Sequence, residues 1–388
     1  MSKIKQIQAK SILDSRGNKT VEVTIETDDG FSGTDSVPSG TSTGTHEAAL
    51  VSVDDAIKNI HDLIAPALIG LEVTEQSIID QKMIELDGTP NKTHLGGNAI
   101  LGVSLAVSRT AAASQHDPLY KYLNQQFSQV IGENIKMKLP MPMMVMICGG
   151  KHADNDLSIQ EFLIEGEVQD GLTIYKELEN IFKNENIEAP VGLEGAFAPK
   201  INDNKQALQF LTRAIENVKD KLKGQVKLGL DIAGNNSNLT SQEVVDLFTK
   251  YNLYTIEDPF GENDWEKFGQ LKLELEETGI PFLLIGDDLF ATRKDLLQKG
   301  ITSIVANGII IKPNQVGTLT EVFEVMKLAR KANFKCIVSH RSGETIDSFI
   351  ADLAVATAAS FIKSGAPIPK ERLVKYERLN VIANELNE

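Results

Sequence analysis

Five charged residues in the second half of the chain lie 25 to 30 positions apart, and each follows or ends an apolar run. They are Asp231 after VKLGL, Glu257 in LYTIED, Asp287 in FLLIGDD, Lys312 after NGIII and His340 after FKCIVS. Carboxylates, amines and imidazoles are the groups that bind divalent cations and move protons in enzymes. The pattern therefore predicts one chemical site assembled from side chains that are distant in the sequence.

The interval between these residues is about the length of one strand, one helix and two loops, because parallel strands need a crossover connection. If such units close into a barrel, the C-terminal strand ends meet at one mouth, where barrel enzymes carry their chemistry. Several of the helical patterns that follow begin with Ser, Thr or Asn, which cap helices. These patterns cover residues 241–252, 262–279, 292–300, 318–333 and 345–360. A short last strand, FIKSG at 361–365, brings Lys363 to the same mouth.

The first third of the chain predicts a separate α+β domain. An alternating stretch at 20–27 is followed by Asp-Asp-Gly, which favours a strand and a hairpin turn. A loop rich in Gly, Ser and Thr at 37–47 and two helical patterns at 54–68 and 98–115 come next. We expect an N-terminal domain at 1–125, a polar linker at 126–138 and a (β/α)8-type barrel at 139–388.

The barrel begins in an unusual way. The apolar runs at 141–147 and 158–166 are separated only by the loop CGGKHADND. This pattern predicts two successive strands without a helix between them, which departs from strict strand–helix alternation.

Composition narrows the function classes. The 388 residues carry a net charge of −15, which argues against non-specific binding to nucleic acid or to anionic membranes. No apolar run approaches the roughly 20 residues of a membrane span, and the first ten residues lack the apolar core of a signal peptide. The two cysteines, Cys148 and Cys336, form neither a disulfide framework nor a metal-binding pair by their spacing. We therefore expect a cytoplasmic protein.

Asp231, Glu257 and Asp287, here called the acidic trio, predict a metal site. A single carboxylate at the end of a strand is usually just solvated. Three on consecutive strands lie close together and repel one another unless a cation neutralises them. Oxygen ligation suits a hard cation, and Mg²⁺ keeps positions open for substrate and water. We therefore expect Mg²⁺ at the trio.

Lys312 ends the next strand around the barrel, and its role has two interpretations. It can form a salt bridge with the acidic trio, or it can act as a base. A lysine beside a divalent cation and a second lysine, Lys363, should have its protonated form disfavoured. The segment His340-Arg341-Ser342-Gly343 adds a guanidinium, a hydroxyl and backbone N–H groups, which suit a phosphate.

Motifs along nearly the whole chain resemble the enolase family. They include SILDSRGN at 11–18, VPSGTSTG at 37–44, GGNAILGVSLA at 96–106, GGKHADN at 149–155, IEDPF at 256–260, SHRSGET at 339–345 and KERLVKYERL at 370–379. The resemblance implies an N-terminal α+β capping domain on an enolase-type barrel. It also implies the reversible, Mg²⁺-dependent dehydration of 2-phosphoglycerate to phosphoenolpyruvate in glycolysis, by a homodimer or higher homo-oligomer. A base of the lysine type with one or two Mg²⁺ ions is the pattern of this superfamily.

The resemblance also implies roles for single residues. Two Mg²⁺ ions are expected, the first on the acidic trio and the second on Ser39 of the glycine-rich loop. Lys312 would remove the C2 proton of the substrate, and Glu194 in GLEGAF, with Glu161 of QEF close by, would protonate the departing C3 hydroxyl. His152, on a second loop that closes over the site, would also be catalytic. Residues from several loops would contact the substrate, namely His152, Glu161, His340, Arg341, Ser342, Lys363 and Ser39.

Several positions depart from the family pattern, although none of them removes the base, the acid or a metal ligand. The segment after Asp231 is shorter than in the family. Five single residues also differ from the usual family residue, which is Asp at Leu193, Asn at Cys148, a small residue at Asp154, Ala at Thr41 and Val at Pro313. We expect Pro313 to remove a hydrogen-bond donor from the end of its strand.

These departures leave three hypotheses. The chain is a 2-phosphoglycerate dehydratase, or a paralogue that uses the base and Mg²⁺ on a related carboxylate, or a non-catalytic binding or surface protein on the same scaffold. The intact Lys312 and acidic trio argue against the third.

Overall fold

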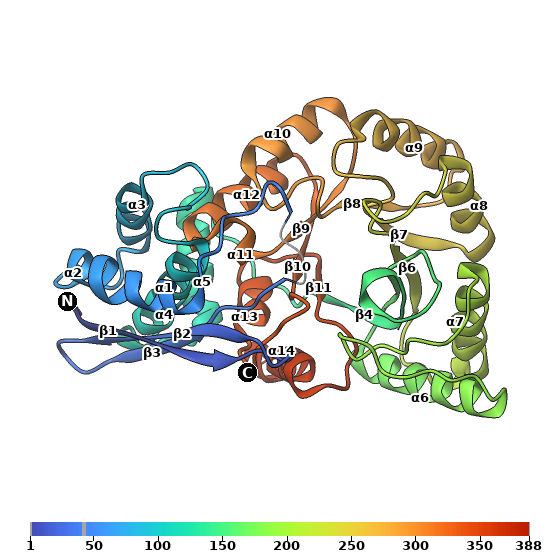
Figure 1. Ribbon diagram of the computed structural model, residues 1–388, viewed down its shortest axis with the longest axis horizontal. Helices are drawn as coiled ribbons and strands as arrows, with labels where there is room; N and C mark the ends of the chain where they lie inside the picture. The colour runs from blue at the N-terminus through green and yellow to red at the C-terminus, as the bar shows by residue number, and fades with distance from the viewer. Residues whose placement is uncertain (1, 41–43, 388) are drawn as a thin grey trace.

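The computed structural model describes residues 2–40 and 44–387, so Thr41 lies outside the described residues. Figure 1 shows an N-terminal domain of strands and helices beside a barrel that is surrounded by helices. The expected α/β fold with a capping domain is confirmed.

The N-terminal sheet has three antiparallel strands with β2 in the centre. The predicted strand at 20–27 is confirmed as β2, whereas β1 was not predicted, because its apolar residues do not alternate with polar ones. The long helix α4 packs on this sheet at close range, and a Cβ on Gly33 would lie 2.5 Å from the backbone nitrogen of Thr110. The strands are β1 (Ile4–Leu13), β2 (Lys19–Thr27) and β3 (Ser32–Ser36).

Helices cover the other side of the domain and lead to the barrel. They are α1 (Val53–Asn59), which continues through the π-helical turn η1 (Ile60–Ile64) into α2 (Ala65–Leu68), then α3 (Gln76–Asp87), α4 (Gly97–Ser114) and α5 (Leu119–Ile131). The boundary expected at residue 125 falls inside α5, so residues 126–131 are helix and not linker.

Eight strands close the barrel in the order β10-β11-β4-β5-β6-β7-β8-β9. They are β4 (Met141–Cys148), β5 (Glu161–Glu165), β6 (Lys227–Asp231), β7 (Leu253–Glu257), β8 (Leu283–Gly286), β9 (Gly308–Ile311), β10 (Lys335–Ser339) and β11 (Phe361–Lys363). The two successive strands without an α-helix between them are β4 and β5, as predicted. Strand β5 runs antiparallel to both neighbours, so its first residue, not its last, lies at the mouth of the barrel.

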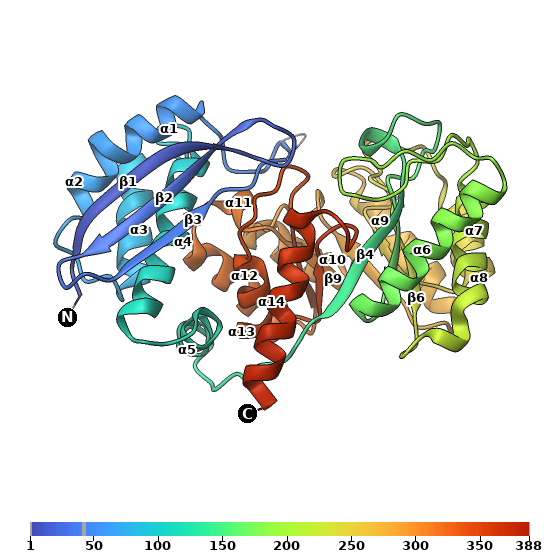
Figure 2. The ribbon, with the colours of Figure 1, turned by 90° about the horizontal axis from the view of Figure 1, so that it is seen from below.

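The helices of the barrel lie on its outside (Figures 1 and 2). They are α6 (Val168–Asn184), α7 (Asn204–Val218), α8 (Ser241–Tyr251), α9 (Trp265–Glu277), α10 (Lys294–Ser303), α11 (Pro313–Val316), α12 (Leu319–Lys331), α13 (Phe349–Ala356) and α14 (Lys370–Asn387), with the short turns η2 (Gly150–His152) and η3 (Lys219–Lys221). Five of these correspond to the helical patterns after Asp231, which confirms those predictions.

Polar contacts join the N-terminal domain to the barrel. Asp80 on α3 accepts a hydrogen bond of 3.0 Å from the backbone of Thr320, and Arg109 on α4 lies 2.6 Å from Asp347 after β10. The barrel loop that carries His340 is thereby tied to the capping domain. Among the described residues, no helix combines the length and the apolar character needed to cross a membrane.

Candidate active site

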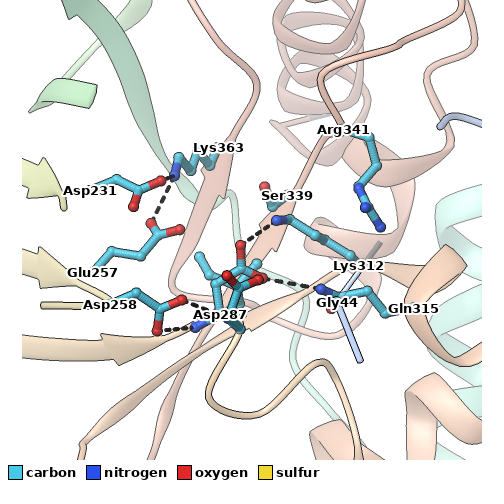
Figure 3. Close-up of polar contacts among 12 residues, drawn as sticks. Gly44, Asp231, Glu257, Asp258, Asp287, Lys312, Gln315, Ser339, Arg341 and Lys363 are labelled. Carbon is cyan, nitrogen blue, oxygen red and sulfur yellow. Dashed lines mark hydrogen bonds and ion pairs between the residues drawn. The ribbon is translucent and has the colours of Figure 1, made fainter. Parts of the chain in front are cut away.

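Lys363 lies among carboxylates at the mouth of the barrel (Figure 3). Its Nζ is 2.9 Å from Glu161 Oε2, 3.0 Å from Asp231 Oδ2 and 2.8 Å from Glu257 Oε2. The strand register explains this convergence, because Glu161 pairs with Asp231 across β5 and β6, and Asp231 pairs with Glu257 across β6 and β7. Glu161 is part of this group because β5 runs antiparallel to its neighbours.

Asp287, just after β8, belongs to a neighbouring set of contacts. It forms an ion pair with Lys312, and Gln315 Nε2 donates to its Oδ1 at 3.2 Å (Figure 3). Asp258 fixes the backbone at this point, since its carboxylate accepts from the N–H of Asp287 at 3.0 Å. Lys312 thus makes the salt bridge that sequence reasoning left open.

Burial and neighbouring charges set the protonation of these groups. Burial, together with repulsion from Asp231, raises the pKa of Glu257 well above its ordinary value. Burial alone would raise the pKa of Asp287, but Lys312 and Lys363 hold it below the ordinary value. Burial also opposes the charged form of Lys312, but the attraction of Asp287 outweighs it and raises the lysine pKa. This direction applies to the residues of the chain alone, and the expectation that a divalent cation beside Lys312 disfavours its protonated form stays a prediction.

The acidic groups at the mouth can hold a cation. Glu257 Oε1 is buried and has no hydrogen-bond partner among the described residues, so one strong acceptor remains for a ligand. In the described part of the chain, two groups of three residues each bring their ligand atoms within 4.8 Å of one another. The first group is His152, Glu161 and Glu194, and the second is Asp258, Asp287 and Asp288. The acidic trio does not form such a group, because Lys363 contacts Asp231 and Glu257 while Lys312 contacts Asp287. The carboxylate oxygens at the mouth are nevertheless ligands of the type that a hard divalent cation prefers.

A chain of two glutamates and two histidines forms another part of the site. Glu194 Oε1 lies 3.8 Å from His152 Nδ1, and its Oε2 lies 3.4 Å from His340 Nε2. His152 Nδ1 also lies 3.3 Å from Glu161 Oε1. Burial would raise the pKa of Glu194, but the two histidines lower it well below its ordinary value.

The two histidines titrate in opposite directions. Burial would lower the pKa of His152, but Glu194 and Glu161 outweigh this effect and raise it to about 9. Burial dominates at His340 and lowers its pKa to about 4. At neutral pH the imidazole of His152 is therefore charged and the imidazole of His340 is neutral.

Loops of the N-terminal domain approach the residues expected to bind phosphate. Arg341 Nη1 donates to Glu47 Oε2 at 2.9 Å and to Asn314 Oδ1 at 2.8 Å. The Ser39 hydroxyl donates to Asp14 Oδ2 at 2.8 Å, and the Ser39 backbone pairs with Gly343. Ser39 is thus joined to the loop after β10 and not to the acidic trio.

One cavity at the mouth joins most of the predicted residues. It is lined by His152, Glu161, Glu194, Asp231, Asp287, Lys312, His340, Arg341, Ser342 and Lys363. Strands β5 and β9 are four places apart in a ring of eight, so Glu161 and Lys312 lie on opposite sides of the mouth. Ser39 and Glu257 do not line the cavity, although Glu257 contacts Lys363, which does.

Comparison with known proteins agrees with this architecture. The family description "Enolase, N-terminal domain" matches residues 4–123, and "Enolase, C-terminal TIM barrel domain" matches residues 136–243 and 234–388. The chain belongs to the enolase family. One curated relative, named enolase, from Natranaerobius thermophilus, is 42% identical over 421 aligned residues, which cover 100% of this chain and 96% of the relative.

The positions that depart from the enolase pattern differ in their surroundings. Leu193 is 40% exposed, whereas the Cys148 thiol is buried and lies 3.6 Å from the carbonyl oxygen of Phe197. Asp154 is an exposed residue that lies 2.8 Å from Lys200. Pro313 is the first residue of α11, where its missing N–H is not needed, so the expected loss of a strand hydrogen bond is wrong.

Sequence reasoning missed several residues that hold the site together. They are Glu47 and Asn314 at Arg341, Asp258 and Gln315 at Asp287, and Arg372 at His340. The available signal was the enolase resemblance, because Asp258 lies within IEDPF, Asn314 and Gln315 lie within IKPNQVGTL at 311–319, and Arg372 lies within KERLVKYERL.

Proposed function

We propose that this protein catalyses the reversible dehydration of 2-phosphoglycerate to phosphoenolpyruvate, the phosphopyruvate hydratase reaction of glycolysis. One cavity at the mouth of the barrel carries the proposal. Lys312, next to β9, lines one side of it, and Glu161 and Glu194, next to β5, line the opposite side. A base and an acid on opposite sides of a bound substrate can remove a proton from one carbon and a hydroxyl from the next.

In the proposed reaction, Lys312 accepts the proton from C2 of the substrate. The electrons of that bond form the C2–C3 double bond as the C3–O bond breaks. Glu194 supplies a proton to the departing hydroxyl, which leaves as water. His152 lies within 4 Å of both Glu161 and Glu194. Glu161 and His152 therefore orient this acid.

Binding of the anionic substrate needs the cations of the site, since the whole chain carries a charge of −15. We assign the substrate carboxylate to Lys363 and the phosphate to Arg341 and Ser342, with His340 beside them. The contact between Arg341 and Glu47 keeps the guanidinium at the cavity wall, and a guanidinium is the side-chain group best suited to bind phosphate.

The enolase family depends on a metal, and we propose Mg²⁺ as the ion. Asp231, Glu257 and Asp287 would hold the first ion, and Ser39 would contribute to a second one near the phosphate. When bound, Mg²⁺ supplies positive charge that stabilises the carboxylate of the substrate and shares the charge of Asp287. That sharing would weaken the attraction that raises the pKa of Lys312, which then becomes the base.

Two further expectations concern assembly, which rests on family likeness, and location, which rests on the composition of the sequence. We propose a homodimer or higher homo-oligomer, which sedimentation velocity would test, and a cytoplasmic location, which fractionation of the source cells would test. Membrane or nucleic-acid partners are not part of the proposal, given the negative charge of the chain.

The proposal is tested by following the ultraviolet absorbance of phosphoenolpyruvate from 2-phosphoglycerate, with Mg²⁺ and with EDTA. Formation of product only with Mg²⁺, and its loss in Lys312→Ala, would support the proposal. Lys335→Ala, at the opposite end of the barrel, serves as the control. The absence of product at every Mg²⁺ concentration would reject it, and turnover of a related phosphorylated carboxylate alone would favour the paralogue hypothesis.

A further inference from the structure

Arg372, in the first turn of the last helix α14, is fully buried in the wall of the active site. Its Nη1 lies 2.5 Å from His340 Nδ1 and 2.5 Å from the carbonyl oxygen of Arg341. Its Nη2 donates to the carbonyl oxygen of Ser342 at 2.6 Å. One guanidinium therefore contacts three consecutive residues of the loop after β10, all of which line the cavity.

The contact with His340 determines where the imidazole carries its proton. The ring is neutral at pH 7, because burial lowers its pKa to about 4. A neutral imidazole has one nitrogen that donates and one that accepts, and a guanidinium can only donate. His340 Nδ1 must therefore accept from Arg372, so the ring proton lies on Nε2.

We infer that Arg372 is a positioning residue of the active site, which holds His340 in the tautomer whose Nε2–H faces Glu194. His340 Nε2 lies 3.4 Å from Glu194 Oε2, a buried oxygen that has no hydrogen-bond partner among the described residues and so faces the ring N–H as its nearest charged or polar neighbour on this side. The importance of this contact for catalysis rests on the proposed function, in which Glu194 is the acid.

The tautomer decides which form of Glu194 is favoured. A ring N–H that faces a carboxylate stabilises its ionised form, whereas a ring lone pair would stabilise the protonated form. Glu194 must change between these two forms in each turnover, so the orientation of His340 influences the balance between them. Arg372 acts on the acid through His340 and does not need to touch the substrate.

The surrounding packing holds Arg372 and His340 in place. Lys375, one turn further along α14, lies 2.6 Å from Glu344 Oε2 and fixes the end of the same loop. Gly365 closes the space between the two side chains, because a Cβ there would lie 3.2 Å from both Arg372 Cδ and His340 Cε1. The imidazole therefore has little room to turn over and exchange its nitrogens.

The inference is tested by NMR on the full-length protein labelled with ¹⁵N histidine. The chain has six histidines, and the signals of His340 are assigned as those lost in His340→Gln. We expect long-range ¹H–¹⁵N spectra at pH 7 to show an unprotonated Nδ1 and a protonated Nε2. A protonated Nδ1 in the wild-type protein would overturn the inference, and this measurement needs no variant of Arg372.

The second part compares Arg372→Lys with Arg378→Lys. Arg378 lies on the same helix and pairs with buried Asp352 at 2.7 Å, away from the cavity, so it controls for loss of a buried ion pair. We expect Arg372→Lys to mix the two tautomers and to raise the pKa of Glu194, so that the high-pH limb of the pH profile of kcat moves to higher pH. Arg378→Lys should leave both unchanged. An unchanged tautomer in folded Arg372→Lys would overturn the inference.

These outcomes separate the inference from the proposed function. If the wild-type protein has the expected tautomer but forms no phosphoenolpyruvate, the proposed function fails and the positioning of His340 by Arg372 stands. If it forms phosphoenolpyruvate with a protonated Nδ1, the proposed function stands and the inference fails.

Discussion

The ammonium nitrogen of Lys363 lies 2.8 Å from Glu257 Oε2, at the centre of carboxylates from β5, β6 and β7. These carboxylates hold Lys363 in its charged form, since they raise its pKa well above the ordinary value although burial opposes this. A divalent cation that binds Asp231 and Glu257 must share them with this ammonium group. We therefore expect Lys363 to transfer part of its contacts to the substrate carboxylate in the complete active site.

The first prediction concerns the metal ligands. We expect Asp231→Asn to weaken the binding of Mg²⁺ by at least about tenfold, because a neutral amide replaces one of few charged ligands. Isothermal titration calorimetry with Mg²⁺ gives the affinity directly. Asp288→Asn is the matched comparison, since Asp288 belongs to the alternative acidic group with Asp258 and Asp287.

The comparison distinguishes the two acidic groups. Asp288→Asn should retain the affinity for Mg²⁺ within a few-fold. If Asp288→Asn loses the ion and Asp231→Asn retains it, the ion belongs to Asp258, Asp287 and Asp288, and our assignment is wrong.

The second prediction concerns the base. We expect Lys312→Ala to reduce the exchange of the C2 proton of 2-phosphoglycerate with solvent deuterium by about 10²- to 10⁴-fold, as for the loss of a general base. The affinity for Mg²⁺ should stay the same or rise, because Asp287 loses its ion-pair partner. Proton NMR in D₂O measures the exchange, and Lys335→Ala is the control. Unchanged exchange would remove Lys312 from this role.

Much of this architecture was predictable from local patterns. The apolar runs that end in Asp231, Glu257 and Lys312 mark strands, and parallel strands of one barrel bring such ends to a common mouth. The pair of strands before the first α-helix of the barrel also followed from the pattern, because only a short loop separates two apolar runs. These features depend on residues within one strand–helix unit.

The contacts between side chains were not predictable in the same way. Arg341 pairs with Glu47 across 294 positions, and Lys363 meets Glu257 across 106. Neither contact leaves a periodic signal in the sequence, since each depends on how the domains and strands pack. The ion pair of Lys312 with Asp287 stayed one of two interpretations for the same reason, because it depends on the rotamer of the lysine.

The third prediction concerns Leu193. The pKa of Glu194 lies well below its ordinary value although burial opposes this, because His340 and His152 stabilise the carboxylate. An acid with so low a pKa is a poor proton donor near neutral pH. We expect Leu193→Asp to raise kcat a few-fold, since an adjacent negative charge raises the pKa of Glu194. Steady-state kinetics measure this effect, and Leu193→Asn supplies the control without charge. An equal gain in Leu193→Asn would assign the effect to polarity and not to charge.

Glu165 forms a different kind of site at the far end of β5 from Glu161. The side chain is buried, its Oε1 accepts from the Thr255 hydroxyl at 2.5 Å, and its Oε2 has no hydrogen-bond partner among the described residues. Burial raises the pKa of Glu165 to about 7, against an ordinary value of 4.5. The folded protein therefore binds this proton more tightly than the unfolded chain does.

The fourth prediction follows from the sign of that difference. The stabilising effect of protonated Glu165 is complete below about pH 4.5 and is lost as the pH rises through about 7. We expect Glu165→Gln to gain stability over the wild-type protein, by up to about 3 kcal/mol, between pH 5 and pH 8. Urea unfolding at both pH values measures the change, and Glu188→Gln, in an exposed loop, is the control. If the difference between wild-type and Glu165→Gln proteins is the same at both pH values, Glu165 is ionised in the folded protein and the prediction is wrong.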